Sequence, residues 1–280
     1  MNVHIWYFSG TGNTWYISCQ IAQALARRGC RVSLSSIESS SPAHIDKMIN
    51  RCDVIGFGYP VYGSDVPVPM KKFLGSLPVP KKEIPVFLFC TQWLFSGNAT
   101  QAALEFFPSR LYRVSWSEHL FMPNNVSVTV LPLPYTNDPH RIARRAAGQE
   151  ARISRLADHI TAGHPSRRGF SKTSILLGAM QRAPFRRFFS SLQDDISIDT
   201  DRCVACGYCS SICPVENLIA DGDGRVHPQG RCILCLRCYN FCPTQAVLYR
   251  GKAHRAARGV PYRGPGGFNP RDEKKRWHNY

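Results

Sequence analysis

Residues 203–214 read CVACGYCSSICP, and residues 232–243 read CILCLRCYNFCP. Both runs follow the spacing C-x2-C-x2-C-x3-C-P, and together they contain eight of the twelve cysteines of this 280-residue chain. A spacing this long that occurs twice is too specific to be accidental. The two runs therefore define the chemistry of the C-terminal part of the chain.

The spacing of each run is typical of a [4Fe–4S] site. Three closely spaced thiolates can reach three iron corners of one cluster from a single turning segment, while the fourth cysteine, just before the proline, holds the other cluster. The proline has no backbone N–H to donate and favours a turn away from the cluster. We therefore expect two clusters with crossed ligands. The first would be held by Cys203, Cys206, Cys209 and Cys242, and the second by Cys232, Cys235, Cys238 and Cys213.

Two other uses of cysteine fit this pattern less well. A four-cysteine zinc site uses pairs of cysteines and needs neither the third cysteine nor the C-x3-C-P step. Disulfides are disfavoured because no secretory signal is visible and the other four cysteines stand singly. We expect these four to be buried free thiols. They are Cys19, Cys30, Cys52 and Cys90.

Composition places the chain among soluble globular proteins. Its hydrophobic content of 44% is ordinary, and 280 residues allow one domain with a sizeable core beside a smaller one. No basic region precedes the first apolar segment, so no signal peptide is expected. The longest apolar stretch, residues 84–95, is too short to span a bilayer. We expect a reducing, cytoplasmic location.

A glycine-rich turn, SGTGNT, separates a strand expected over residues 3–8 from a helix expected over residues 15–28. The amides and the dipole at the start of a helix favour an anion at such a turn. The turn lacks the Lys-Ser/Thr pair of a nucleotide-hydrolysing loop, and Trp15 stands where a dinucleotide loop needs its third glycine. A hydroxyl-rich phosphate loop remains, against the alternative of a tight turn that binds nothing. Its residues are Ser9, Gly10, Thr11, Gly12, Asn13 and Thr14.

Strands and helices alternate through the first half of the chain. The apolar strands are nearly continuous, which indicates a parallel sheet covered on both faces. Ligands bind such sheets at the carboxyl ends of the strands, where the loops after the first, third and fourth strands open. The further strands are expected at 31–35, 53–59, 84–90 and 111–117, and the helices at 42–50, 67–77, 98–107 and 141–162.

Two of these loops carry aromatic side chains that can stack on a flavin ring. Tyr59 and Tyr62 follow the third strand, and Trp93 and Phe95 follow the fourth. Each aromatic alone is more often a packing residue, but together, at the edge that holds the phosphate loop, they favour FMN. The expected ring-binding residues are Pro60, Val61, Tyr62, Gly63, Thr91, Trp93, Phe95 and Gly97.

With the phosphate loop FSGTGNT (8–14), the loop YPVYG (59–63) and the two cysteine runs, the chain resembles the flavodoxin–ferredoxin fusion proteins. The resemblance covers residues 1 to about 250. It implies a doubly wound, flavodoxin-like α/β domain with a five-stranded parallel sheet of strand order 2-1-3-4-5. It also implies a small α+β ferredoxin domain with two [4Fe–4S] clusters, and electron transfer. Ordinary flavodoxins are acidic whereas this chain is basic, so their docking partners do not carry over.

We divide the chain into a flavodoxin-like FMN-binding domain (1–163), a basic and apolar linker (164–195), a ferredoxin domain (196–250) and a mobile basic tail (251–280). Residues 121–139 are either a lid over the flavin ring or an irregular connection, and we favour the connection. The linker could lie on an anionic membrane, but Pro184 interrupts it and favours an interdomain packing helix. The tail is rich in Gly, Pro and Arg, which favours mobility. A tight hairpin is expected at 221–224.

The formal net charge of +16 would fall to roughly +10 once two clusters and FMN are bound. This balance favours acidic redox protein partners, and the dispersed basic residues argue against specific nucleic-acid binding. The expected function is an iron–sulfur flavoprotein that passes electrons between its clusters and FMN, with no catalytic residue assigned. Two alternatives stay open. One is a ferredoxin-linked, flavin-dependent reductase of a small-molecule acceptor, and the other is a cluster-only redox protein whose first domain is a docking module.

Overall fold

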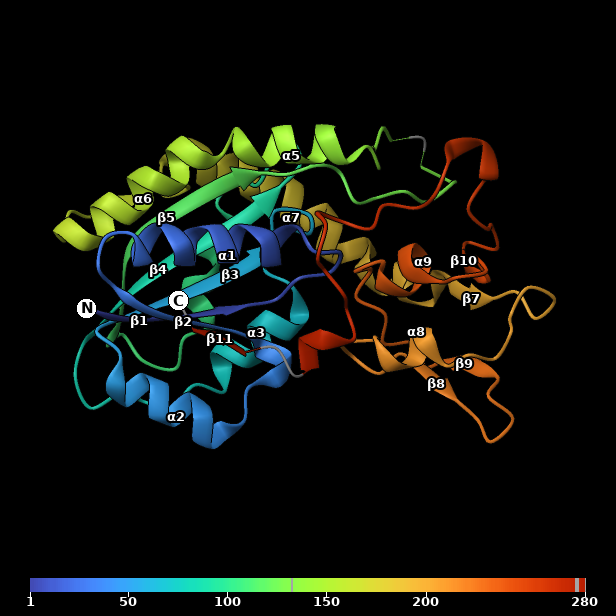
Figure 1. Cartoon of the computed structure of the whole chain (residues 1–280), viewed down its shortest axis with the longest axis horizontal. Coiled ribbons are helices and arrows are strands. Elements are labelled where there is room, and N and C mark those ends of the chain that lie inside the picture. The colour runs from blue at the N-terminus through green and yellow to red at the C-terminus, as the bar shows by residue number, and fades with distance from the viewer. Residues whose placement is uncertain (132, 275–276, 280) are drawn as a thin grey trace.

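The computed structural model describes residues 1–131, 133–274 and 277–279. In this part of the chain the main sheet has the strand order β11-β2-β1-β3-β4-β5-β6 (Figure 1). All neighbouring strands from β2 to β6 run parallel, and β11 is antiparallel to β2. The predicted order 2-1-3-4-5 is confirmed, with one short strand added at each edge. The strands are β1 (Asn2–Tyr7), β2 (Arg31–Ser36), β3 (Val54–Pro60), β4 (Ile84–Gln92), β5 (Tyr112–Phe121), β6 (Ser166–Arg167) and β11 (Trp277–Asn279).

Helices cover both faces of the sheet, and each face has its own apolar core. One core joins the sheet to α1, α5 and α6, and the other joins it to α2, α3 and α4 (Figure 1). Close packing needs glycine in β3, because a Cβ at Gly58 would lie 2.1 Å from the Phe89 ring. The helices are α1 (Asn13–Ala26), η1 (Ile37–Ser39), α2 (Pro42–Arg51), α3 (Val68–Gly75), α4 (Ala99–Ala102), η2 (Ala103–Phe106), α5 (Pro139–Ala147) and α6 (Glu150–Ala162).

Three elements differ from the sequence-based expectation. β5 continues to Phe121, because its last residues pair with the end of β4. The helix expected over 141–162 is split into α5 and α6 around Gly148. The helix expected over 98–107 is the single turn α4 followed by the 3-10 helix η2. The longer β5 matters for the site, since it carries the chain to the open edge of the sheet.

A long helix, α7 (Lys172–Leu192), and the 3-10 helix η3 (Gln193–Asp195) connect the two domains. Pro184 lies inside α7 and does not end it. Contacts on both sides of this proline hold α7 to the flavodoxin-like domain: Arg182 Nε donates to Ser64 O at 3.0 Å, and Arg186 Nε donates to Asp65 Oδ2 at 2.7 Å. These anchors compensate for the backbone hydrogen bond that a proline removes from a helix.

The cysteine-rich domain is built from two short antiparallel pairs and two short helices, on the right in Figure 1. Residues Asp221–Gly224 form the tight turn that the sequence predicts, with Asp221 N donating to Arg225 O at 2.8 Å. The elements are β7 (Ile196–Ile198), which pairs with β10 (Val247–Tyr249), β8 (Leu218–Ala220), which pairs with β9 (Val226–Pro228), α8 (Tyr208–Ser211) and α9 (Arg237–Phe241).

The segment that begins at residue 251 was expected to be a mobile tail, but its described residues pack back onto the flavodoxin-like domain (Figure 1). It contains η4 (Ala256–Arg258), η5 (Asp272–Lys274) and the edge strand β11. Tyr262 is buried and donates to Asn13 Oδ1 at 2.5 Å, and the Phe268 and Trp15 rings lie 5.8 Å apart. Two large aromatic side chains therefore anchor a segment whose composition favoured mobility.

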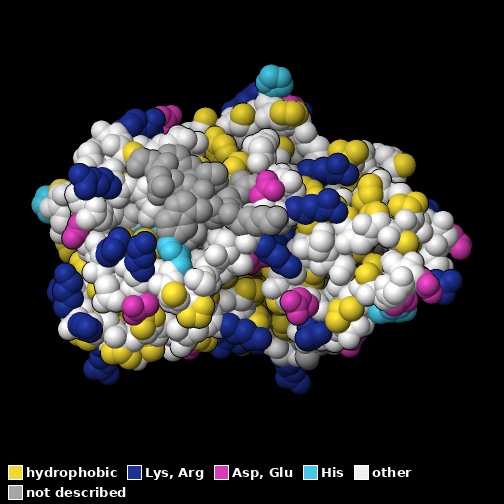
Figure 2. All heavy atoms as spheres, turned by 60° about the horizontal axis from the view of Figure 1, so that its bottom comes forward, with side chains coloured by type: hydrophobic (Ala, Val, Ile, Leu, Met, Phe, Trp, Pro, Cys, Tyr) yellow, Lys and Arg dark blue, Asp and Glu magenta, His cyan; other side chains and the backbone are white. Residues whose placement is uncertain are grey.

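Lys and Arg side chains are scattered over the face shown in Figure 2 and do not gather in one stripe. Among the described residues, no helix combines the length and apolar character needed to cross a membrane.

Candidate redox-cofactor site

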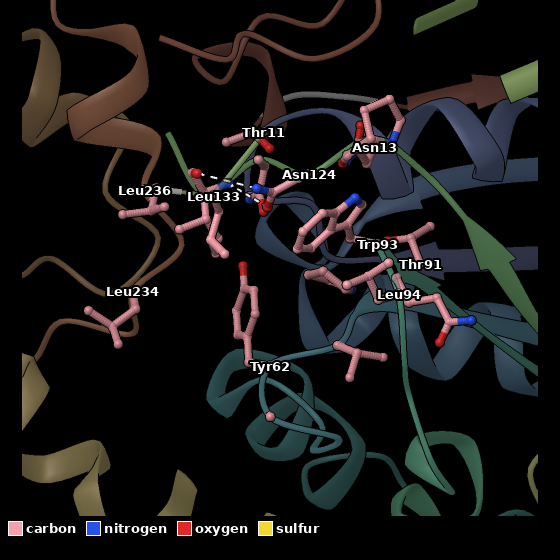
Figure 3. Close-up of a pocket in the computed structure, with 18 of the residues that line it drawn as sticks. Thr11, Asn13, Tyr62, Thr91, Trp93, Leu94, Asn124, Leu133, Leu234 and Leu236 are labelled. Carbon is pink, nitrogen blue, oxygen red and sulfur yellow. Dashed lines mark hydrogen bonds between the residues drawn. The ribbon is translucent and has the colours of Figure 1, made fainter. Parts of the chain in front are cut away.

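A cavity of about 510 Å³ opens at the carboxyl ends of β1, β3 and β4 (Figure 3). Most of the residues predicted to bind FMN line it. These are Ser9, Gly10, Thr11, Asn13, Thr14, Pro60, Val61, Tyr62, Gly63, Thr91, Trp93 and Phe95. The two others, Gly12 and Gly97, do not line the cavity. Both have positive φ. A Cβ added to Gly12 would lie 2.8 Å from the Phe268 ring, and a Cβ added to Gly97 would lie 2.4 Å from Gly178 Cα. These glycines shape the backbone and allow close packing behind the wall of the cavity.

The phosphate loop presents donors to this cavity at the start of α1. No side chain among the described residues caps the first turn of α1, whose N-cap is Gly12. Uncapped amides at a helix start bind an anion well, so the loop fits a phosphate group. The loop is rigid: Gly12 N donates to Ser9 Oγ at 3.1 Å, and Thr14 Oγ1 lies 2.8 Å from Thr91 Oγ1. The Asn13 side chain connects the loop to another part of the cavity wall, since its Nδ2 donates to Pro123 O at 2.9 Å.

Aromatic side chains line the cavity beyond the phosphate loop. In Figure 3, Trp93 lies between Thr11 and Thr91, and the hydroxyl of Tyr62 points into the space below Leu133. That hydroxyl is buried and has no hydrogen-bond partner among the described residues. Burial raises the pKa of Tyr62 well above its usual value, so the hydroxyl stays protonated and can donate. An apolar, aromatic space into which the Tyr62 hydroxyl points fits a planar ring that has polar edges.

Residues 123–131 form no helix or strand, as expected for the irregular connection that we favoured, and with Leu133 they form part of the cavity wall. Asn124 folds this segment, because its Oδ1 accepts from Val126 N at 3.0 Å and its Nδ2 donates to Pro134 O at 2.9 Å. The cysteine-rich domain and the C-terminal segment hold it in place. Ser127 Oγ donates to Asn240 Oδ1 at 2.6 Å, and Arg258 Nη2 donates to Leu133 O at 2.7 Å.

Sequence reasoning missed several lining residues that come from distant parts of the chain. Leu234, Leu236 and Tyr249 belong to the cysteine-rich domain, and Gln181 and Phe185 belong to α7. No local pattern marks them as cofactor contacts, because only the docking of the two domains brings them to this edge of the sheet. The remaining ones are Gln92, Leu94, Pro123, Asn124, Asn125, Val126, Val128, Leu131 and Leu133.

The cysteines of the two runs are brought together in two crossed groups. Cys213 lines one small cavity with Cys232, Cys235 and Cys238. The electrostatic neighbours of Cys209 are Cys242, Cys203 and Cys206. Among the described residues, no three His, Cys, Asp or Glu side chains are placed to hold a single metal ion. The crossed grouping has the composition expected for two four-thiolate clusters.

The two runs also fold alike. Residues two and four positions after the first cysteine of each run have positive φ: Ala205 and Gly207 in the first run, Leu234 and Leu236 in the second. This left-handed backbone is uncommon for residues with a side chain and is often found at functional sites. It turns backbone amides toward sulfur, and Leu234 N donates to Cys232 Sγ at 3.3 Å. Such N–H···S bonds stabilise thiolate ligands.

Without iron, several of the buried thiols would not ionise readily. Burial, together with like charge from the neighbouring Cys213 and Cys242, raises the pKa of Cys232 and of Cys209 to about 11. Burial also raises the pKa of Cys235 to about 12, although Arg237 lowers it. Buried thiols at these positions therefore need cationic iron to become thiolates, so iron binding is coupled to proton release.

The two groups of cysteines lie at unequal depths. Cys206 is exposed, and so is Val204 in the same run, at 63%. Cys235 is buried against the phosphate loop, since a Cβ added to Gly10 would lie 2.9 Å from Cys235 O. The second group therefore adjoins the cavity, and the first faces the outside.

A family model described as a 4Fe-4S dicluster domain matches residues 195–243. Comparison with curated proteins gave no match. Similar solved structures include the Flv1 flavodiiron core from Synechocystis sp. PCC6803, with a TM-score of 0.41 and 20% identity over 58% of this chain, which is aligned with 36% of that chain. A flavodoxin from the domain Archaea has a TM-score of 0.38 and 14% identity over 57% of this chain and 99% of its own. The Megasphaera elsdenii flavodoxin has a TM-score of 0.35 and 22% identity over 56% of this chain and 98% of its own.

At these TM-scores the assignment of the N-terminal fold rests on the strand order itself. That order is the flavodoxin-like 2-1-3-4-5, and the C-terminal part matches the dicluster model. An iron–sulfur domain of this kind supports a role in electron transfer. The chain is a fusion of a flavodoxin-like α/β domain with a 4Fe-4S dicluster ferredoxin domain.

Proposed function

We propose that this protein is an electron-transfer iron–sulfur flavoprotein in which two [4Fe–4S] clusters exchange electrons with FMN. The observation that carries the proposal is the shared cavity. The phosphate loop lines one end of it, and Leu234 and Leu236, which flank Cys235, line another (Figure 3). A flavin there would lie directly against the loop that holds the second group of cysteines.

The chain offers a place for each part of FMN. The phosphate would be bound by the amides at the start of α1 and by the hydroxyls of Ser9 and Thr11. The ring would lie among Tyr62, Trp93 and Phe95, against the wall formed by residues 123–131. When bound, FMN supplies one- or two-electron redox chemistry, whereas each cluster passes one electron at a time.

The unequal depth of the two cysteine groups suggests an order along the electron path. The second cluster, on Cys213, Cys232, Cys235 and Cys238, would adjoin the flavin. The first, on Cys203, Cys206, Cys209 and Cys242, would exchange electrons with an external protein through the exposed loop at Cys206.

Anaerobic reconstitution followed by quantitation of iron, sulfide and flavin tests this proposal. We expect about eight iron ions, eight sulfide ions and one FMN per chain. Iron and sulfide without any flavin would instead favour the cluster-only alternative, in which the first domain docks a partner.

The Tyr62 hydroxyl, which has no hydrogen-bond partner among the described residues, favours one second candidate, a flavin-dependent reductase of a small molecule. A buried donor aimed into the cavity could give a proton or a hydrogen bond to an acceptor bound beside the flavin. Turnover of an acceptor that depends on both reduced clusters and Tyr62 would support this candidate. Equal turnover by wild type and by Tyr62→Phe would remove its structural basis.

We also propose a second redox partner, distinct from the protein that would reach the first cluster at Cys206. This partner is an acidic protein that docks beside the flavin end of the cavity. An open groove there is lined by Phe121 and by Arg141, Arg144, Arg145 and Arg152. It adjoins the cavity, because Arg145 Nη2 donates to Trp93 O at 3.2 Å and Phe121 lies two residues before Pro123. Opposite charge steers weak electron-transfer partners into productive encounters.

A further inference from the structure

Arg237 is a buried arginine inside the second cysteine run, between Cys235 and Cys238. Its side chain is 1% exposed. A buried charge of this size is costly unless it is paired and fully hydrogen-bonded, and here both conditions are met. The Glu38 carboxylate pairs with it, at 2.5 Å from Nη2 and 2.9 Å from Nη1.

The other donors of Arg237 reach backbone carbonyls in two segments. Nη2 donates to Ser9 O at 2.6 Å and Nε donates to Gly10 O at 3.0 Å, both in the phosphate loop. Nη1 donates to Ile212 O at 3.1 Å, next to Cys213. One planar guanidinium thus joins the phosphate loop to both segments that hold the second group of cysteines. The rigid fork of arginine suits such a junction, and the single ammonium of lysine does not.

These contacts also decide where the phosphate-loop amides point. In a trans peptide the C=O and the next N–H lie on opposite sides of the bond. Arg237 holds the carbonyls of Ser9 and Gly10 on its own side, so the N–H groups of Gly10 and Thr11 are turned the other way, and both residues line the cavity. The arginine therefore orients two phosphate-binding donors that it does not touch.

In the part of the chain that the structure describes, the first cysteine run has no counterpart of this junction. The equivalent position there is Tyr208, which lies partly exposed under Arg271, with the guanidinium 4.4 Å from the ring centroid. Although the two runs fold alike, this substitution makes the cysteine-rich domain dock on the phosphate loop with its second run and not with its first.

We propose that Arg237 is the positioning residue that locks the second cluster loop to the flavin phosphate loop, and so sets both the affinity for FMN and the rate of electron exchange between that cluster and the flavin. This inference rests on the proposed function for its redox part. The claim that Arg237 holds the two loops together does not depend on a bound cofactor, because the junction is made by backbone and side-chain atoms of this chain. The electron that leaves the reduced cluster is the electron that reduces the flavin, so no further reactant is needed.

Three substitutions separate the hydrogen-bonding fork of the Arg237 guanidinium from its charge. Arg237→Gln removes both, Arg237→Lys keeps the charge but not the fork, and Glu38→Gln keeps the arginine while removing its counter-ion. Arg231→Gln is the matched control, because Arg231 is an exposed arginine beside Cys232 whose loss changes the net charge equally. All are measured as the full chain after anaerobic reconstitution, with iron content checked first.

We expect Arg237→Gln and Arg237→Lys each to weaken FMN binding by about tenfold or more, since each breaks hydrogen bonds made by a charged group. Both should also slow cluster-to-flavin electron transfer after flash reduction, while Arg231→Gln resembles wild type. Wild-type FMN affinity and rate in Arg237→Lys would overturn the proposal.

Hydrogen exchange on flavin-free protein distinguishes failure of this inference from failure of the proposed function. Faster amide exchange of residues 9–14 in Arg237→Lys than in Arg231→Gln would support the junction even if wild type bound no FMN. Equal exchange in the two variants would refute it, even if wild type did bind FMN. If Arg237→Gln loses iron or fails to fold, Arg237→Lys and Glu38→Gln give the same comparison with smaller changes.

Discussion

Gly10 lies where the phosphate loop touches the second cysteine run, so Gly10→Ala probes the contact between the two domains directly. An added Cβ would lie 2.9 Å from Cys235 O and 3.0 Å from Tyr62 Oη, closer than almost any real Cβ contact. Gly10 does not have positive φ, so its backbone accepts alanine and the clash is the main new cost. Overpacking of this kind costs about 1–3 kcal/mol.

The protein can relieve this strain in two ways, and both affect function. If the phosphate loop moves into the cavity, FMN binding weakens. A cost of about 1–3 kcal/mol placed wholly on binding corresponds to a rise in Kd of about fivefold to 150-fold. If the Cys235 segment moves away instead, the affinity changes little but electron transfer between the second cluster and the flavin slows.

Flavin titration followed by flash reduction of the same sample measures both effects. Gly222→Ala is the matched control, because no atom lies within 4 Å of the Cβ it would add and its φ is not positive. Loss of FMN affinity or of the transfer rate in Gly10→Ala, with both retained in Gly222→Ala, is the expected result. A Gly10→Ala protein that matches the control in both measurements would show that the two loops are not in functional contact.

Three further predictions address the ligands, the phosphate loop and the partner surface. Cys213→Ser should damage the cluster built on the later cysteine run, seen as loss of one of two cluster signals by electron paramagnetic resonance; loss confined to the earlier run's cluster would refute the crossed assignment. Thr14→Val should weaken FMN binding more than Thr91→Val, because both break the same 2.8 Å hydrogen bond but only Thr14 belongs to the phosphate loop. Arg144→Glu should lower the association rate with an acidic redox partner and flatten its salt dependence, whereas Arg110→Glu, at the opposite end of the sheet, should not.

Local patterns were sufficient for the elements that form from near neighbours in sequence. The alternation of apolar strands and helices predicted the parallel order, because strands buried on both faces must be apolar throughout. The phosphate loop was visible because glycines, hydroxyls and a helix start stand together in residues 9–14. The hairpin turn at Asp221–Gly224 needs only its own residues.

Elements that depend on distant partners were missed or described incompletely. The extension of β5 to Phe121 depends on pairing with β4, and the persistence of α7 through Pro184 depends on ion pairs with Asp65. The segment from residue 251 packs onto the flavodoxin-like domain because Tyr262 bonds to Asn13 and Phe268 contacts Trp15. Both partners lie near the other end of the sequence. A composition rich in Gly, Pro and Arg could not reveal those contacts.

The sequence by itself was enough to predict iron–sulfur ligation and a phosphate loop, because each requires particular residues at fixed spacing within one short segment. Only the tertiary structure decided which cysteine run adjoins the cavity at the carboxyl ends of β1, β3 and β4. The two runs have equal spacing and fold alike. They differ in the contacts of the residue before the third cysteine, which is Tyr208 in the first run and Arg237 in the second. Arg237 donates hydrogen bonds to the carbonyls of Ser9 and Gly10 and pairs with the carboxylate of Glu38. A buried guanidinium is stable only where it is paired and hydrogen-bonded in this way.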